Sequence, residues 1–376
     1  MPTQEILKPL SVEDCADVLS WVQEDPQPRE WLIEGYIPAW STGLLLADGG
    51  VGKSNLSNLL CYVIATGQTI GPFHPPKANR VLQINAEDAR GDIALRINAL
   101  ANIYRPKAKD FSLIKKNWLI FPAKQSVGTL MELKAGQAVP TPYLKWLEHS
   151  IKDLQPSLLI LDTKARLYGL DENSNTHNSL WIRELDKISE KYKCGMLILH
   201  HTKKMPPKAT ESEILSAAAG RGGSSTSDDA RYVISAAEIS HKDSQKFGLW
   251  PNYDYFKIQA SKMNYGRKKP PVYFHKQNEG IPVHISPSNR KAEKISEHLL
   301  TWLKGMTEKE VKVTKRDLMR ADTPETRELK DQISKNFYGK TNKGINSDME
   351  ISLNLLIADG RVVVGENGRG NSLGLK

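Results

Sequence analysis

The chain has 376 residues, of which 39% are hydrophobic and 25% charged, values typical of a soluble protein with one large and one small domain. No apolar stretch approaches the roughly 20 residues of a membrane-spanning helix, and the mean hydropathy is −0.46. The start, MPTQEILKPL, lacks the apolar core of a secretion signal. Cys15, Cys61 and Cys194 lack the spacing of a disulfide framework or a zinc site. We therefore expect a cytoplasmic protein without a membrane partner.

Positive charge is concentrated beyond the first hundred residues. The formal net charge is +9, made up of −5 over residues 1–100 and +14 over residues 101–376. A chain that is basic over most of its length favours a polyanionic partner, because Lys and Arg side chains release counterions from nucleic-acid phosphates. Charge alone is equally compatible with a basic protein that binds no nucleic acid.

Short apolar runs alternate with polar helical stretches through most of the chain. Residues 1–40 are polar and acidic, and we treat them as an N-terminal segment and a candidate subunit contact. Unbroken apolar runs are typical of strands buried on both faces of a largely parallel sheet. Such runs lie at 43–47, 81–86, 157–162, 195–201, 231–236 and 256–261, followed by two basic strands at 268–276 and 280–286. We therefore predict an α/β domain over residues 41–286.

The last part of the chain, residues 290–376, predicts a second, smaller domain. Three stretches have helical patterns: KAEKISEHLLTWLKG, TKRDLMRA and INSDMEISLNLLIADG. The end, RVVVGENGRGNSLGLK, is typical of two strands joined by a tight turn. Three helices followed by a hairpin is the order of a winged helix-turn-helix. A three-helix cap that only covers the main domain is the alternative.

The strongest motif is ADGGVGKS at 47–54, which follows a predicted strand and precedes a predicted helix. This is the context of a P-loop, in which backbone N–H groups and a lysine surround nucleotide phosphates at a helix N-terminus. Ala47 replaces the usual first glycine, a mild departure because alanine is still small. The predicted ATP-binding residues are Gly49, Gly50, Val51, Gly52, Lys53, Ser54 and Asn55.

Two carboxylates end neighbouring predicted strands. Asp162 closes SLLILD, and an Asp in this position can hold Mg²⁺ together with the Ser54 hydroxyl. Glu87 closes VLQINAE and is the candidate general base that polarises the attacking water. The alternative for Glu87 is a helix-start residue that interacts with the helix dipole.

His200 and His201 end another predicted strand, GMLILHH. A polar side chain there would sense the γ-phosphate and relay its presence to the following loop, and His201 is the preferred candidate. A purely structural histidine is the alternative for at least one of the two.

Seven segments carry a family resemblance across about residues 30–285: EWLIEGYIPAW, GGVGKS, INAEDARGDIALRINAL, LLILDTKARLYGLDENSN, LILHHTKK, AAGRGGSSTSDDARYV and IQASKMNYG. In order and approximate spacing they resemble the RepA-like hexameric replicative DNA helicases, which are RecA-like P-loop ATPases of plasmids and phages. The resemblance implies a hexameric ring of subunits with ATP and Mg²⁺ at each interface and single-stranded DNA in the channel. A replication initiator or primase would be a further partner.

Position by position, the resemblance implies roles for the residues already named. Lys53 and Ser54 would form Walker A, Asp162 Walker B, Glu87 the catalytic base, and His200 with His201 the sensor pair. A cation from the neighbouring subunit would stabilise the transition state. Its candidates are Arg221 and Lys262, with Arg231 and Arg267 as weaker ones.

The loops after the Walker B and sensor strands, at about 166–177 and 203–226, would face the DNA. The second contains three lysines, Lys203, Lys204 and Lys208, and then AAAGRGGSST, which we expect to be flexible and to follow a phosphate backbone without reading bases. An ordinary surface loop is the alternative.

Two regions depart from the helicase pattern: the C-terminal domain and the basic, hairpin-like run at 107–135. They leave open an ATP-switched DNA-binding initiator or regulator without processive unwinding, and a filament former of the recombinase type.

Overall fold

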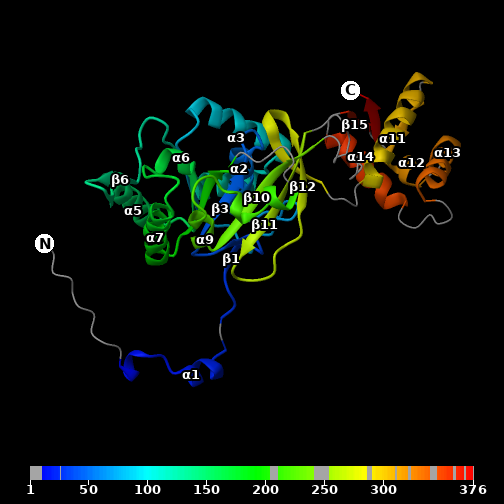
Figure 1. The fold of residues 1–376 in the computed structure, drawn as a ribbon. Coiled ribbons are helices and arrows are strands. Elements are labelled where there is room, and N and C mark those ends of the chain that lie inside the picture. The colour runs from blue at the N-terminus through cyan, green and yellow to red at the C-terminus, as the bar shows by residue number, and fades with distance from the viewer. Residues whose placement is uncertain are drawn as a thin grey trace. The chain divides into compact units, whose positions relative to one another are not determined.

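A computed structural model describes most of the chain (Figure 1). The described residues are 11–25, 27–203, 211–240, 254–285, 290–309, 311–320, 323–338, 345–358, 361–367 and 370–375. Contacts within the chain separate the residues up to Glu30 from those that begin at Trp31. The first group contains a 3-10 turn (Val12–Asp14) and helix α1 (Val18–Gln23). Asp17 caps α1 by accepting a hydrogen bond from the Leu19 amide at 3.0 Å.

The second group is organised around a nine-stranded sheet with the order β13–β12–β11–β10–β3–β9–β8–β4–β5. The strands from β10 to β5 run parallel, and β11, β12 and β13 continue the sheet in antiparallel fashion. Their bounds are β3 (Thr42–Ala47), β4 (Val81–Asn85), β5 (Trp118–Pro122), β8 (Leu158–Asp162), β9 (Gly195–His201), β10 (Tyr232–Ile239), β11 (Tyr255–Met263), β12 (Val272–Gln277) and β13 (Ile281–Ile285). All eight strands predicted for the main domain are present, and the α/β prediction is confirmed.

Helices cover both faces of this sheet because successive strand side chains point to opposite sides. On β3, Leu45 packs in one apolar cluster with Leu56 of α2, whereas Leu46 packs in another with Trp181 and Leu185 of α7. The helices are α2 (Lys53–Thr66), α3 (Arg90–Tyr104), α4 (Ala108–Asn117), α5 (Pro142–Leu154), α6 (Lys164–Leu167), α7 (Asn175–Tyr192), α8 (Glu211–Ile214) and α9 (Ser225–Asp229), with 3-10 turns at Ala217–Ala219 and Asn278–Gly280. Because the strands from β10 to β5 are parallel, their carboxyl ends lie along the same edge of the sheet.

Two short hairpins lie outside this sheet. One is β1 (Trp31–Ile33) with β2 (Ile37–Pro38), and the other is β6 (Met131–Lys134) with β7 (Gln137–Pro140). Ile33 and Ile37 are fully buried and belong to the same apolar cluster as α2. The predicted domain boundaries at residues 40 and 286–290 stay predictions.

The basic run at 107–135 differs from the hairpin-like segment that we expected. Its first part is helix α4, and its second part is β5, which forms the edge of the main sheet. Asp110 fixes the start of α4 by accepting a hydrogen bond from the Lys107 amide at 2.7 Å. Only residues from Met131 onward belong to a hairpin, the one formed by β6 and β7. Its turn residues Ala135 and Gly136 both adopt positive φ angles, as a tight two-residue turn requires.

The C-terminal residues have an apolar cluster of their own, formed by residues such as Ile295, Leu318, Leu329 and Leu353. The elements are α11 (Arg290–Glu308), β14 (Val313–Thr314), α12 (Lys315–Arg320), α13 (Pro324–Ile333), a π-helical turn (Ser334–Tyr338), α14 (Ile345–Ala358), β15 (Val362–Asn367) and β16 (Gly370–Leu375). The three strands form a sheet with the order β14–β16–β15. The three predicted helices and the hairpin are present, and α13 and β14 are additions that we did not predict. That these residues form a separate winged-helix-like domain stays a prediction.

Among the described residues, no helix combines the length and the apolar character needed to span a bilayer.

Candidate active site

The turn between β3 and α2 has the backbone shape of a ligand cradle. Gly50 and Gly52 adopt left-handed conformations with φ angles of 85° and 103°, which side chains disfavour. A Cβ atom added at Gly49 or Gly50 would meet no other atom within 4 Å, so the space beside the turn is open. Every residue predicted to bind ATP lies on this turn or on the first helical turn of α2: Gly49, Gly50, Val51, Gly52, Lys53, Ser54 and Asn55.

Lys53 is buried and bends back over this turn. Its Nζ donates hydrogen bonds to the carbonyls of Ala47 and Asp48, both at 2.9 Å, and lies 3.1 Å from Nδ1 of His201. Burial lowers the pKa of the Lys53 ammonium, and the charges of Glu87 and Asp162 oppose that shift. Phosphate oxygens can replace these carbonyl partners, because a lysine ammonium binds phosphate as a compact point charge.

Residues of β12 and of the 3-10 turn that follows it contact the P-loop and the start of α2. Lys276 of β12 donates to the Gly50 carbonyl at 2.9 Å and pairs with Glu238 at 2.6 Å. The Asn55 side chain donates to the Glu279 carbonyl at 2.7 Å. Sequence reasoning missed Lys276 and Glu279, because they lie more than 200 residues beyond the motif and carry no pattern of their own.

The end of β8 and the start of α2 bring together the two predicted magnesium ligands, Asp162 and Ser54. Asp162 is fully buried, and burial raises the pKa of its carboxyl to about 7, while a hydrogen bond from Ser54 opposes the shift. Its Oδ1 atom is buried without a hydrogen-bond partner. The described residues contain no group of three or more His, Cys, Asp or Glu side chains that suits a metal ion. Mg²⁺ at nucleotide sites needs only one or two protein ligands beside phosphates, so this carboxylate and hydroxyl fit that ion.

Glu87 is positioned by an asparagine that sequence reasoning missed. The side-chain oxygen of Asn85 accepts hydrogen bonds from the amides of Glu87 at 3.1 Å and Asp88 at 2.8 Å. The Asn85 amide group lies 3.4 Å from Oδ2 of Asp162, and Arg96 forms an ion pair with Asp88. Asn85 thereby shapes the turn that presents half-buried Glu87 beside Asp162. The only signal in the sequence was a polar residue at the end of an apolar strand.

The two predicted sensor histidines have different surroundings. His201 Nδ1 accepts from Lys53, and burial together with the Lys53 charge lowers the His201 pKa. His200 is buried, and burial lowers its pKa to about 3, so the ring is neutral and its Nε2 donates to the Arg221 carbonyl at 2.8 Å. Only His201 therefore contacts the P-loop lysine, whereas His200 supports a neighbouring backbone segment.

Both preferred candidates for a cation acting on a neighbour are bound within their own chain. Arg221 pairs with Glu172 at 3.2 Å between Nε and Oε2. Lys262 donates to the carbonyls of Ser227 and Asp228 at the end of α9. The weaker candidates, Arg231 and Arg267, are exposed. An action of any of these cations on a neighbouring subunit stays a prediction.

The glycine-rich stretch that follows the sensor strand makes close backbone contacts, and its flexibility stays a prediction. We name residues 217–226 the arginine segment. Its Gly223 amide donates to the Glu172 carbonyl at 2.9 Å, and a Cβ atom at Gly222 would lie 2.3 Å from that oxygen. Gly222 also has a φ angle of 80°. These glycines permit close approach to the loop after β8. Of the lysines predicted for DNA contact, Lys203 is exposed, while Lys204 and Lys208 lie outside the described residues.

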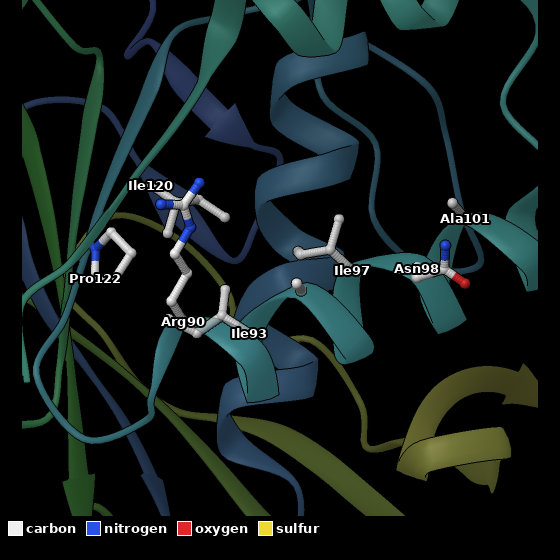
Figure 2. A pocket seen from close by; sticks show the side chains of 8 residues that line it. Arg90, Ile93, Ile97, Asn98, Ala101, Ile120 and Pro122 are labelled. Atoms are coloured by element: carbon white, nitrogen blue, oxygen red, sulfur yellow. The ribbon is translucent and has the colours of Figure 1, made fainter.

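A hollow of about 420 Å³ lies between α3 and the edge strand β5 (Figure 2). Its walls are mostly apolar, and Arg90 extends along one side. The lining residues are Arg90, Ile93, Ala94, Ile97, Asn98, Ala101, Ile120 and Pro122. None of the predicted site residues lines it.

A match to a family model agrees with this geometry at the level of a family. A family model described as an AAA domain matches residues 7–206, which is more than half of the chain. Among solved structures, the chain is similar to a KaiC-like protein from the hyperthermophilic archaeon Pyrococcus horikoshii. That similarity has 16% sequence identity and a TM-score of 0.43, and it covers 68% of this chain and 94% of the other.

Proposed function

The chain belongs to the AAA domain family of P-loop ATPases, and from this premise we propose that it is an ATP-dependent replicative DNA helicase acting as a ring on single-stranded DNA. The observation that carries the proposal is a continuous set of contacts around His201. Its side chain contacts Lys53 of the P-loop, and its backbone oxygen accepts a hydrogen bond from the Arg221 amide at 2.9 Å. One residue thus links the phosphate site to the segment proposed to face DNA.

The side chains of the P-loop and of the neighbouring strand ends have separate roles in hydrolysis. Lys53 leaves its carbonyl partners for the β- and γ-phosphates of ATP, where the P-loop amides also donate. Ser54 and Asp162 would hold Mg²⁺, which would supply positive charge to the bound phosphates. Glu87 orients the attacking water and accepts its proton, and Asn85 keeps the Glu87 turn in place.

Coupling to DNA follows from what His201 loses when nucleotide binds. Once Lys53 moves to the phosphates, the His201 ring no longer has that partner, and its orientation becomes sensitive to the γ-phosphate. The backbone of His201 and the ring of His200 both hold Arg221, so such a change reaches the arginine segment. Release of phosphate would then shift the grip of this segment on the strand.

Single-stranded DNA is the proposed polyanion because the chain carries +14 over residues 101–376 and the stretch 203–226 has lysines without aromatic residues. This composition suits contact with a phosphate backbone and gives no stacking platform for bases. A homohexameric ring would place such segments around one strand, and Arg221 or Lys262 would supply the cation at the neighbouring ATP site. An initiator or primase is the proposed further partner.

The test combines ATP hydrolysis, with and without single-stranded DNA, and unwinding of a forked duplex. We expect DNA to stimulate hydrolysis in the wild type, and Lys53→Ala and Glu87→Gln to lower both activities at least about a hundredfold. Glu132→Gln, on the exposed β6–β7 hairpin, is the matched control and should behave as wild type. Normal hydrolysis by Lys53→Ala would show that the site is wrongly assigned.

The winged-helix-like sheet β14–β16–β15 favours a second candidate, an ATP-switched DNA-binding initiator or regulator. Hydrolysis without unwinding of the fork, together with duplex binding that is lost on removal of residues 290–376, would support it. Images of the assembly on DNA would separate a closed ring from an open filament of the recombinase type.

A further inference from the structure

A buried lysine next to the Walker B strand makes polar contacts that the proposed chemistry does not use. Lys164 follows Asp162 by two residues and is fully buried. Its Nζ donates to the side-chain oxygens of Asn178 at 2.5 Å and Thr226 at 2.9 Å, and lies 4.4 Å from the centre of the Tyr168 ring. In the described part of the chain, no carboxylate lies within ion-pair distance of this ammonium.

Burying this ammonium group costs free energy that a residue serving only to fill space would not require. Burial disfavours the charged form and lowers the Lys164 pKa to about 8, and the charge of Glu172 opposes that shift. A buried ammonium with neutral partners stays partly uncompensated, and an apolar side chain of similar volume would avoid that cost. The polar head of Lys164 therefore requires an explanation other than packing.

Asn178 connects Lys164 to the surrounding loops with all its hydrogen-bonding capacity. Its oxygen accepts from Lys164 and from Thr226, the latter at 2.8 Å. Its amide group donates to the carbonyls of Glu172 and Ser174, both at 2.8 Å. We name Lys164, Asn178 and Thr226 the lysine hub. It joins α6, α7 and α9 at one point.

The hub lies between two parts of the proposed motor. On one side, α6 begins directly after the strand that carries Asp162. On the other, Thr226 ends the arginine segment, and the Glu172 carbonyl held by Asn178 also holds the Gly223 amide. A shift at the end of β8 would therefore move the arginine segment through the existing hydrogen bonds of the lysine hub.

We infer that Lys164 is a positioning residue that holds the arginine segment, through Asn178 and Thr226, in the register needed for its response to DNA. The part of this inference that concerns DNA rests on the proposed function. Its mechanical part, that the hub fixes residues 217–226, stands on the contacts alone.

Two matched substitutions separate this role from general packing. Lys164→Met keeps the length of the side chain and removes the ammonium, and Thr226→Val keeps the shape and removes the hydroxyl. Thr226→Ser retains the hydroxyl and is the control. The full-length protein is used throughout, with hydrogen–deuterium exchange of peptides covering residues 217–226 and ATP hydrolysis with and without single-stranded DNA.

We expect Lys164→Met and Thr226→Val to speed exchange in residues 217–226 about tenfold while exchange in β3 and β8 stays as in the wild type. Stimulation of hydrolysis by DNA should fall at least about fivefold. Thr226→Ser should match the wild type in both measurements.

Unchanged exchange in residues 217–226 would overturn the inference. So would faster exchange spread evenly over the domain, or faster local exchange with full DNA stimulation. A wild type whose hydrolysis ignores DNA would instead refute the proposed function, and the exchange measurement would still decide whether the hub fixes the segment.

Discussion

Glycines occur in both the P-loop and the arginine segment, but the structure uses them for opposite purposes. At Gly50 the backbone is left-handed and the space where a side chain would stand is open, with no atom within 4 Å. At Gly222 the backbone is also left-handed, but the Glu172 carbonyl fills that space at 2.3 Å. The first turn keeps room for a ligand, and the second is occupied by the protein itself. A glycine-rich stretch is therefore not in itself a sign of flexibility or of a binding loop.

The largest expected effect comes from adding one methyl group at each turn. Gly222→Ala should lower the free energy of unfolding by about 3 kcal/mol or more, because it adds both a left-handed alanine and an overlap with backbone. Gly50→Ala should cost only the conformational part, about 1 kcal/mol, but should weaken ATP binding. Thermal and denaturant unfolding, together with nucleotide titration, measure both changes.

Gly136 supplies the control for the conformational part alone. It has a φ angle of 79° at the tip of the β6–β7 hairpin, and an added Cβ atom would meet nothing within 4 Å. Gly136→Ala should match Gly50→Ala in stability and bind ATP as the wild type does. Equal losses at Gly222 and Gly136 would contradict the close packing of the arginine segment.

Acid should weaken the support of the arginine segment through His200. Burial lowers the pKa of His200 to about 3 and that of His275 to about 4, whereas each binds a proton near pH 6.5 in the unfolded chain. Stability from these neutral rings is fully present above pH 6.5 and is lost progressively as the pH falls to the folded-state pKa, about 3 for His200 and about 4 for His275. At pH 5 the loss is about 2 kcal/mol for each ring.

His200→Gln tests this contribution, since glutamine keeps a donor for the Arg221 carbonyl and does not titrate. Denaturant unfolding at pH 7.5 and pH 5 should show a loss smaller than that of the wild type by about 2 kcal/mol. Asp162, whose pKa is raised to about 7, titrates in both proteins, so its opposite contribution cancels. His149→Gln, on the exposed face of α5, is the control and should lose as much as the wild type.

The sequence was informative where chemistry depends on neighbours along the chain. The P-loop is contiguous, Asp162 and His201 each end an apolar strand, and Glu87 follows one by two residues, so strand polarity alone brings them to one edge. The parallel sheet was predictable for the same reason, because strands buried on both faces have unbroken apolar runs.

Contacts between distant segments left no comparable signal. Lys276 reaches Gly50 across 226 residues, and the approach of Gly222 to Glu172 depends on two loops that no local pattern relates. Helix α4 was missed because its Lys-rich sequence was interpreted as part of a hairpin, and α13 was missed because its short, highly charged sequence has few apolar residues. In each case tertiary packing decided what local composition could not.

The smallest expected effect separates charge from backbone in holding the arginine segment. Glu172→Gln removes the ion pair with Arg221 but keeps the Glu172 carbonyl, which accepts from Gly223 and Asn178. The Arg221 side chain is 62% exposed, so solvent screens the pair, and the free energy of unfolding should fall by less than about 1 kcal/mol. Arg221→Gln should have the same effect, and the double variant should add nothing further. A loss above about 2 kcal/mol would mean that the ion pair, rather than the backbone contacts permitted by Gly222 and Gly223, fixes the segment.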